Sequence, residues 1–168
     1  MGKRKKRRSA MKKNRQGEWV INPDATTLLR DFCDALWSKA VIADYAGKCA
    51  ICGRTENLNA HHLINRHHTG TRHMLENGFC LCGYCHTMCP NYSPHMNEEG
   101  WKSWLEENFP HVAKWEHMAW NTGLHKFDSV KTVFYYCDIL NHLKQYFSDD
   151  EFAAVVGKRF SEYLEENQ

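Results

Sequence analysis

Apolar residues recur at helical spacing near the start of the chain and again over its second half. After the helix-start signal Asn22-Pro23-Asp24, one face of a helix over about 24–45 collects Leu28, Leu29, Phe32, Leu36, Trp37, Ala40 and Val41. Similar stripes predict helices over about 97–108, 111–122, 128–147 and 149–165. We expect these stripes to form the hydrophobic core.

Several predicted helices carry recognisable end signals. Gly47 and Gly123 each follow a helical stripe and are expected to end it. Ser148 is followed three residues later by Glu151, a capping box that predicts the start of the last helix.

The segment 46–96 has a different pattern. It is rich in Gly, Asn and His, and its apolar runs are short, which predicts strands at Leu58 to Ile64 and at Gly78 to Leu81. The chain is therefore expected to be α+β and mostly helical, with a small strand-containing centre flanked by helices. The expected organisation is an N-terminal arm over 1–16, a helix within 17–46, a core over 47–109 and a helical region over 110–168.

Cysteine is concentrated in this central segment. Cys49-Ala-Ile-Cys52 and Cys82-Gly-Tyr-Cys85 are two C-x-x-C units separated by 29 residues. Two such units supply the four thiolates of a closed, structural Zn²⁺ site. Free thiols or a redox pair are the weaker alternatives. Cys33 and Cys137 lie on apolar helix faces and are expected to be small buried residues, whereas Cys80 or Cys89 could replace a ligand.

The N-terminal segment is strongly basic. Residues 1–16 contain nine Lys and Arg and no acid, so the other 13 basic and 20 acidic residues leave a net charge of −7. Such a run is expected to be a disordered arm that serves solubility or binds phosphates. The residues proposed to contact nucleic acid are Lys3, Arg4, Lys5, Lys6, Arg7 and Arg8.

The location of the protein follows from two missing signals. No apolar run reaches about 18 residues, and the charged start contains no apolar stretch, so the sequence predicts neither a membrane span nor a secretory signal. We therefore expect a cytoplasmic protein with reduced cysteines, for which metal binding is a better interpretation than disulfides.

The order of the chemistry-bearing residues resembles a known family. Between the two C-x-x-C units lie His61-His62 and Asn77, and His86 directly follows Cys85. This order resembles the HNH nucleases with the ββα-metal fold, and is most similar to small phage-type HNH and recombination endonucleases. The resemblance covers about 46–109 and includes Ser93-Pro94-His95. For a phage-encoded protein the expected location is the host cytoplasm.

The resemblance implies a role for each residue of the motif. His61 and His86 would bind a catalytic divalent metal, Mg²⁺, Mn²⁺ or another transition metal, and His62 would be the general base. Asn77 would brace the loop that carries the base. Pro90 occupies the position of a third ligand in some family members and cannot bind. The simplest expectation is a site with two histidines, with His95 as the nearest replacement ligand.

The insert between His62 and Asn77 leaves two interpretations open. His67, His68 and His73 are expected to be polar loop residues, or else to contact DNA together with Arg66 and Arg72. The two arginines could also bind the phosphate beside the metal.

The expected function is hydrolysis of DNA phosphodiester bonds by a metal-dependent endonuclease, by nicking or double-strand cleavage. One alternative is a non-catalytic zinc-knuckle module that binds nucleic acid or protein. Another is an interaction domain, because residues 97–168 contain 7 basic and 13 acidic residues. These C-terminal helices are expected to face a protein partner or a second copy of the chain rather than DNA.

Overall fold

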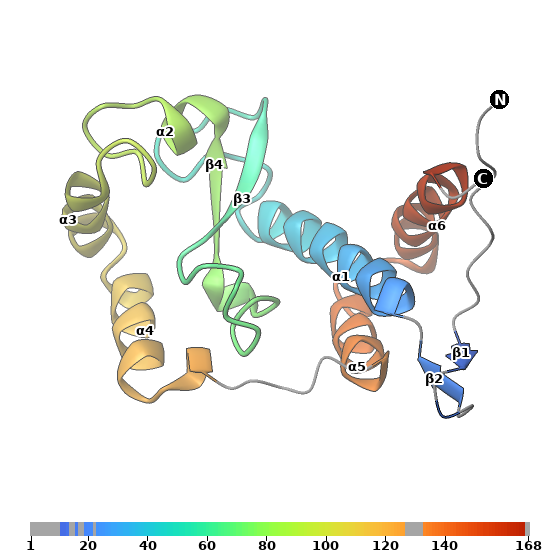
Figure 1. Cartoon of the computed structure of the whole chain (residues 1–168). Helices are drawn as coiled ribbons and strands as arrows, with labels where there is room; N and C mark the ends of the chain where they lie inside the picture. The colour runs from blue at the N-terminus through green and yellow to red at the C-terminus, as the bar shows by residue number, and fades with distance from the viewer. Residues whose placement is uncertain (1–10, 14–15, 17–18, 22, 127–132, 167–168) are drawn as a thin grey trace, which may run out of the picture. The chain divides into compact units, whose positions relative to one another are not determined.

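The computed structural model describes residues 11–13, 16, 19–21, 23–126 and 133–166. The fold is α+β and mostly helical, which confirms the expected class (Figure 1). The elements are β1 (Met11–Lys13), β2 (Trp19–Ile21), α1 (Pro23–Asp44), β3 (Leu58–His62), η1 (Leu75–Asn77), β4 (Gly78–Cys82), α2 (Gly83–Thr87), α3 (Glu98–Asn108), α4 (Pro110–Asn121), η2 (Leu124–Lys126), α5 (Val133–Lys144) and α6 (Asp149–Glu166).

The chain divides into two compact units. One unit is Trp37–Ser129, and the other joins Met1–Leu36 to Val130–Gln168. The division falls inside α1 and after η2, not at the expected positions 46/47 and 109/110. The last turns of α1 belong with the strands because Val41 packs over Gly78 so closely that a side chain at Gly78 would have no room.

Helix α1 buries the predicted apolar stripe from Phe32 onward. Phe32, Leu36, Trp37, Ala40 and Val41 are all at most 6% exposed. The helix ends where Ala46 and Gly47 adopt left-handed backbone angles, with φ of 52° and 66°. Burial of this stripe removes apolar surface from water, which is the main force that holds the helix in place.

In the unit Met1–Leu36 with Val130–Gln168, Cys33 is buried as the sequence predicted. Cys33 is fully buried, and its sulfur lies 3.6 Å from the backbone oxygen of Tyr136 on α5. Cys33 is thus the small buried residue that its helical position predicted, whereas Cys137 is only partly buried.

A second short sheet lies in a segment expected to be disordered. β1 pairs antiparallel with β2, with Met11 opposite Ile21 and Lys13 opposite Trp19. The prediction of a disordered arm over 1–16 is therefore corrected for Met11–Lys13. A strand pairs through its backbone N–H and C=O groups, so a basic sequence does not prevent strand pairing. Residues 1–10, with all six cations proposed to bind nucleic acid, lie outside the described residues.

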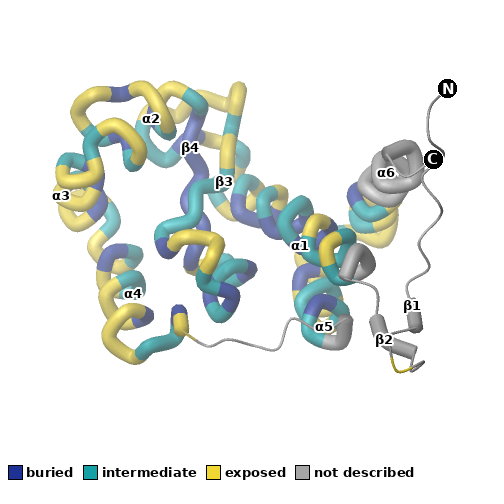
Figure 2. Tube along the Cα trace, in the orientation of Figure 1, coloured by how far each residue is buried: buried dark blue, intermediate teal, exposed yellow. Residues whose placement is uncertain are grey.

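Strands β3 and β4 form the centre of the unit Trp37–Ser129 (Figure 1). They pair antiparallel, with Leu58 opposite Cys82, His61 opposite Phe79 and His62 opposite Gly78. Every residue of β4 is buried, as Figure 2 shows along the strand. The sequence placed the end of the first strand at Ile64, but β3 ends two residues earlier.

Helix α3 and the residue between α3 and α4 pack against β4 through aromatic rings. Phe79 on β4 contacts Trp101, Trp104 and Phe109 edge to face, with ring centroids 5.0–6.3 Å apart. Such pairs add stability beyond the burial of their area. The strand pair is therefore held in part by aromatic contacts with α3 and with the N-cap of α4.

The predicted helix ends at Gly123 and Ser148 are confirmed. Gly123 has a φ of 72°, the left-handed conformation that ends α4. The Ser148 backbone N–H donates to the Glu151 carboxylate at 2.9 Å, and the Glu151 N–H donates to the Ser148 hydroxyl at 3.3 Å. This reciprocal pair is the capping box that opens α6.

Candidate metal centres

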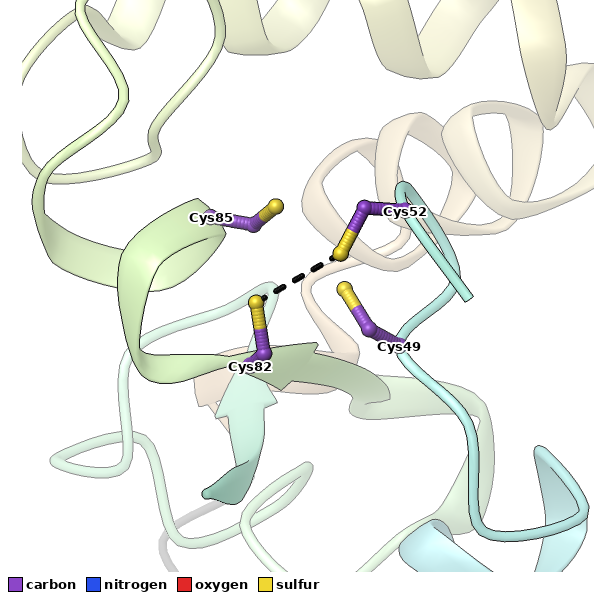
Figure 3. A group of neighbouring side chains, drawn as sticks. All are labelled: Cys49, Cys52, Cys82 and Cys85. Carbon is purple, nitrogen blue, oxygen red and sulfur yellow. Dashed lines mark hydrogen bonds between the residues drawn. The ribbon is translucent and has the colours of Figure 1, made fainter. Parts of the chain in front are cut away.

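The first C-x-x-C unit forms a tight turn before β3. The Cys49 backbone N–H donates to the carbonyl of Arg54 at 2.8 Å, and the Gly53 N–H donates to the carbonyl of Cys49 at 2.9 Å. Gly53 has a φ of 72°, which a residue with a side chain adopts only at a cost. The turn directs both cysteine sulfurs to one side (Figure 3).

The second unit lies where a strand becomes a helix. Cys82 ends β4 and caps the N-terminus of α2, and Cys85 lies in the first turn of that helix. The Gly83 N–H donates to the carbonyl of Asn57 at 2.9 Å, which ties this corner to the loop that begins with the first unit.

The four sulfurs of these units point at one another (Figure 3). All four lie within 4.8 Å of one another, and the sulfurs of Cys52 and Cys82 are 3.6 Å apart. In a tetrahedral site with Zn–S bonds of about 2.3 Å, the sulfurs lie about 3.8 Å apart. The cluster therefore has the donor set and spacing of a structural zinc site.

The thiols of the cluster do not ionise equally without a cation. Burial raises the pKa of Cys85, and hydrogen bonds with Cys52 and Cys82 raise it further. Burial also tends to raise the pKa of Cys49, but backbone N–H groups of Cys52, Cys82 and Ile51 outweigh it and lower the pKa to about 7. Cys49 is thus prepared to be a thiolate, and a cation would be needed to keep all four sulfurs ionised together.

The two ambiguous cysteines lie outside this cluster. Cys80 is fully buried on β4, and burial raises its pKa to about 11, which favours the thiol. Cys89 is also buried, in the segment after α2. Among the described residues, neither sulfur replaces a member of the set Cys49, Cys52, Cys82 and Cys85.

A second group of ligand atoms contains only histidine nitrogens. His61 Nδ1 lies 3.1 Å from His86 Nε2, which lies 3.2 Å from His95 Nε2. One ring nitrogen from each of the three residues falls within 4.8 Å of the others. Three imidazoles that converge in this way could hold one metal ion.

The third histidine reaches the cluster through a turn built around a buried serine. Ser93 is fully buried, its hydroxyl donates to the carbonyl of His86 at 2.7 Å, and it accepts from the His95 N–H at 3.2 Å. His95 therefore lies beside His86 although the helix α2 has already ended. The group that could hold a metal therefore contains His95, the nearest replacement ligand that the sequence offered, besides His61 and His86.

The local environment lowers the pKa of two of these rings, His61 and His86, which favours their neutral form. Burial lowers the pKa of His61 to about 3, with smaller effects from His86, His95 and His62. Burial and the neighbouring His95 also lower the pKa of His86. Neutral imidazole is the form that binds a metal.

His62, the next residue on β3, has a separate set of neighbours. Its ring stacks on Trp37, with centroids 3.8 Å apart and an interplanar angle of 16°. Its Nε2 lies 3.0 Å from the backbone oxygen of Arg72. A carbonyl can only accept, so Nε2 carries the proton and the basic lone pair of the neutral ring is on Nδ1. His61 and His62 thus make different contacts, as expected of adjacent residues on a strand.

Asn77 is fully buried and braces the loop that follows His62. Its side-chain oxygen accepts from the Ile64 N–H at 2.7 Å, and its amide group donates to the carbonyls of Ile64 and Thr71 at 2.9 and 3.0 Å. This is the bracing geometry that the sequence analysis expected of Asn77. A role in catalysis is a separate prediction.

The insert between His62 and Asn77 is more ordered than a polar loop. His73 is only 4% exposed, and His68 packs edge to face against Trp120 and His125. His68 and His73 are thus loop residues, as the first interpretation expected, but they pack against other groups, whereas His67 is exposed. The Arg72 guanidinium donates to the carbonyl of Arg66 at 2.9 Å. DNA contacts by these arginines stay a prediction.

The described residues of this α+β protein contain two clusters that could each hold a metal ion, one of four cysteines and one of three histidines. A scan against protein-family models, a search of curated proteins and a search of solved structures each found no match. Within the described ranges, no helix combines the length and the apolar content needed to cross a bilayer.

Proposed function

We propose that this protein is a metal-dependent endonuclease of the HNH type that hydrolyses DNA phosphodiester bonds. The observation that supports it most is that two adjacent histidines on β3 are suited to different tasks. His61 lies in a cluster of three imidazoles, and His62 has its proton on Nε2, so that its Nδ1 is the basic nitrogen. A nuclease of this class needs a metal ligand and a general base side by side.

His62 acts as the general base in this proposal. The Arg72 carbonyl keeps its proton on Nε2, so Nδ1 accepts a proton from the attacking water. Asn77 keeps the backbone after β3 in place through Ile64, so the ring is presented in one orientation. The water oxygen forms a bond to phosphorus as the bond from phosphorus to the 3′ oxygen breaks, and the leaving 3′ oxygen takes a proton from solvent water.

His61, His86 and His95 would hold the catalytic ion. A divalent metal bound there neutralises charge on the scissile phosphate and stabilises the leaving oxygen as a Lewis acid. Three neutral imidazoles suit Mn²⁺, Zn²⁺ and related transition metals better than Mg²⁺. Protein ligands from three residues leave positions for water and a phosphate oxygen.

The four-cysteine cluster supports this centre indirectly. Cys85 is followed by His86 on the same five-residue helix, so zinc bound to Cys85 would fix the position of the ligand next to it. The helix is too short to be stable alone. Zinc would therefore supply the rigidity that the catalytic centre needs.

The decisive variant is His62→Ala, assayed on supercoiled plasmid with Mn²⁺ and with Mg²⁺. We expect cleavage to fall by a factor of about 10² to 10⁴, the usual contribution of a general base, with zinc content unchanged. His67→Ala is the matched control, because His67 is an exposed histidine of the same loop region. Equal cleavage by the His62→Ala and His67→Ala variants would contradict the proposal.

The proposed contact between the basic N-terminal segment and DNA is tested by measuring how binding depends on salt concentration. Removal of residues 1–10 deletes the cations Lys3 to Arg8 and keeps β1. We expect duplex DNA to bind more weakly and with a flatter dependence on salt, because fewer counterions are released. An unchanged salt dependence would exclude the arm from the DNA contact. Binding without any cleavage by the wild-type protein would favour the non-catalytic zinc-knuckle module instead.

A further inference from the structure

We propose that Trp37 is a positioning residue for His62, which rests on the proposed role of His62 as the general base. The sequence assigned Trp37 only to the hydrophobic core. The two residues are 25 positions apart and lie on different elements, α1 and β3, yet their rings stack at 3.8 Å. Trp37 would act through His62 and would not touch the substrate.

The contacts of His62 restrict its ring in two different ways. The Arg72 carbonyl accepts a hydrogen bond from Nε2 at 3.0 Å. A hydrogen bond to one ring nitrogen does not by itself prevent rotation of the ring. The indole of Trp37 covers one face of the ring at an angle of 16°, which blocks that rotation. Together the two contacts define where Nδ1 points.

Trp37 is itself fixed rigidly. It is only 2% exposed, and its indole N–H donates to the carbonyl of Met74 at 2.9 Å. Its aromatic plane therefore has little freedom to turn. A ring held on both its face and its polar edge is a suitable surface against which to orient a second ring.

Both restraints on His62 come from one hydrogen-bonded loop. Arg72 and Met74, whose carbonyls hold His62 and Trp37, are two residues apart. The loop is closed by hydrogen bonds from the Met74 N–H to Thr71 and from the Asn77 N–H to Met74, at 3.1 and 3.2 Å. The segment 71–77 thus positions the base, the tryptophan and the bracing asparagine as one unit.

The kinetic test compares three variants in the full-length, zinc-loaded protein. Trp37→Leu removes the planar face, and we expect kcat to fall roughly 10- to 100-fold with KM changed less than about threefold, as for a misplaced catalytic group. Trp37→Phe keeps a ring face, so kcat should stay within about threefold of the wild type. Val41→Ala is the matched control, because it also removes buried volume from the same part of α1 without a stacking contact to His62.

A second readout does not depend on cleavage. NMR relaxation of the ¹³C–¹H groups of the His62 ring reports its mobility, and we expect a rigid ring in the wild type and in Trp37→Phe. In Trp37→Leu the ring should become more mobile, while the bond to the Arg72 carbonyl keeps the proton on Nε2. Where zinc content shows that the leucine variant does not fold, Trp37→Met replaces it, because methionine fills an irregular core without offering a plane.

The outcomes separate the inference from the proposed function. A kcat for Trp37→Leu no lower than that of Val41→Ala, or a His62 ring in Trp37→Leu that is as rigid as in the wild type, would overturn the role of Trp37. A wild-type protein that cuts no DNA would overturn the nuclease proposal, and the NMR comparison would still decide whether Trp37 orients His62.

Discussion

The two clusters of the unit Trp37–Ser129 differ in nearly every physical property that matters to a metal. The four sulfurs of Cys49, Cys52, Cys82 and Cys85 form a closed set in which three of the residues are buried. The nitrogens of His61, His86 and His95 form an open set of three, and His95 is exposed. A closed thiolate set stabilises a fold, whereas an open imidazole set leaves room for a substrate.

The difference also has a consequence for charge. Four thiolates over-neutralise a divalent ion, so the ion in such a cluster is a poor Lewis acid and a strong cross-link. Three neutral imidazoles leave the full charge of the ion directed at an incoming phosphate. Under the proposed function, this small unit separates the metal that stabilises the fold from the metal that takes part in the reaction, although Cys85 and His86 are adjacent.

The largest expected effect is the loss of a thiolate. Cys85→Ser should release zinc and abolish the cooperative unfolding transition of the unit, because structural zinc contributes on the order of 10 kcal/mol to such folds. Elemental analysis and thermal circular dichroism measure both effects. Cys80→Ala is the control, since Cys80 is equally buried but outside the cluster, and it should keep one zinc. Full zinc retention by Cys85→Ser would remove the distinction between the clusters.

The next effect concerns the imidazole set. His86→Ala should weaken the second metal at least about 100-fold and stop cleavage, while the zinc content and the melting transition stay near those of the wild type, since a metal ligand is lost but no core contact. Calorimetric titration with Mn²⁺ or Zn²⁺ measures the affinity. Loss of both metals together would show that the two clusters act as one centre.

The next prediction concerns Asn77, which braces the loop that follows His62. Asn77→Ala deletes three hydrogen bonds from a fully buried side chain. We expect a loss of about 2–4 kcal/mol in the free energy of unfolding, because the backbone groups of Ile64 and Thr71 lose their partner. Denaturant unfolding measures it, and the zinc content should not change. A loss below about 0.5 kcal/mol would contradict the bracing role.

The smallest effect, taken per pH unit, is a dependence of the free energy of unfolding on pH. Because burial lowers the pKa of His61 from 6.5 to about 3, the unfolded chain binds a proton that the folded chain does not between these values. Without the second metal, the free energy of unfolding should fall as the pH is lowered from 6.5 toward 3, by at most about 1.4 kcal/mol per pH unit. His61→Gln should remove this part of the slope. Parallel curves for the two proteins would show that the ring is not buried in its neutral form.

Local signals in the sequence accounted for much of the fold. The Ser148–Glu151 capping box, the helix end at Gly123 and the stripe on α1 all act within one or two helical turns, and the structure confirms each of them. The paired C-x-x-C spacing likewise predicted which four sulfurs meet. Signals of this range are readable because neighbouring residues impose them on the backbone.

The sequence by itself thus determined the helices, the cysteine cluster and the order of the histidines. Only the tertiary structure decided that His95 joins His61 and His86, that His73 is buried, and that Trp37 covers the ring of His62. These outcomes depend on the path of loops that are held by single buried groups such as Ser93 and Asn77. The path of a loop is set by contacts between distant residues, which no spacing along the chain encodes.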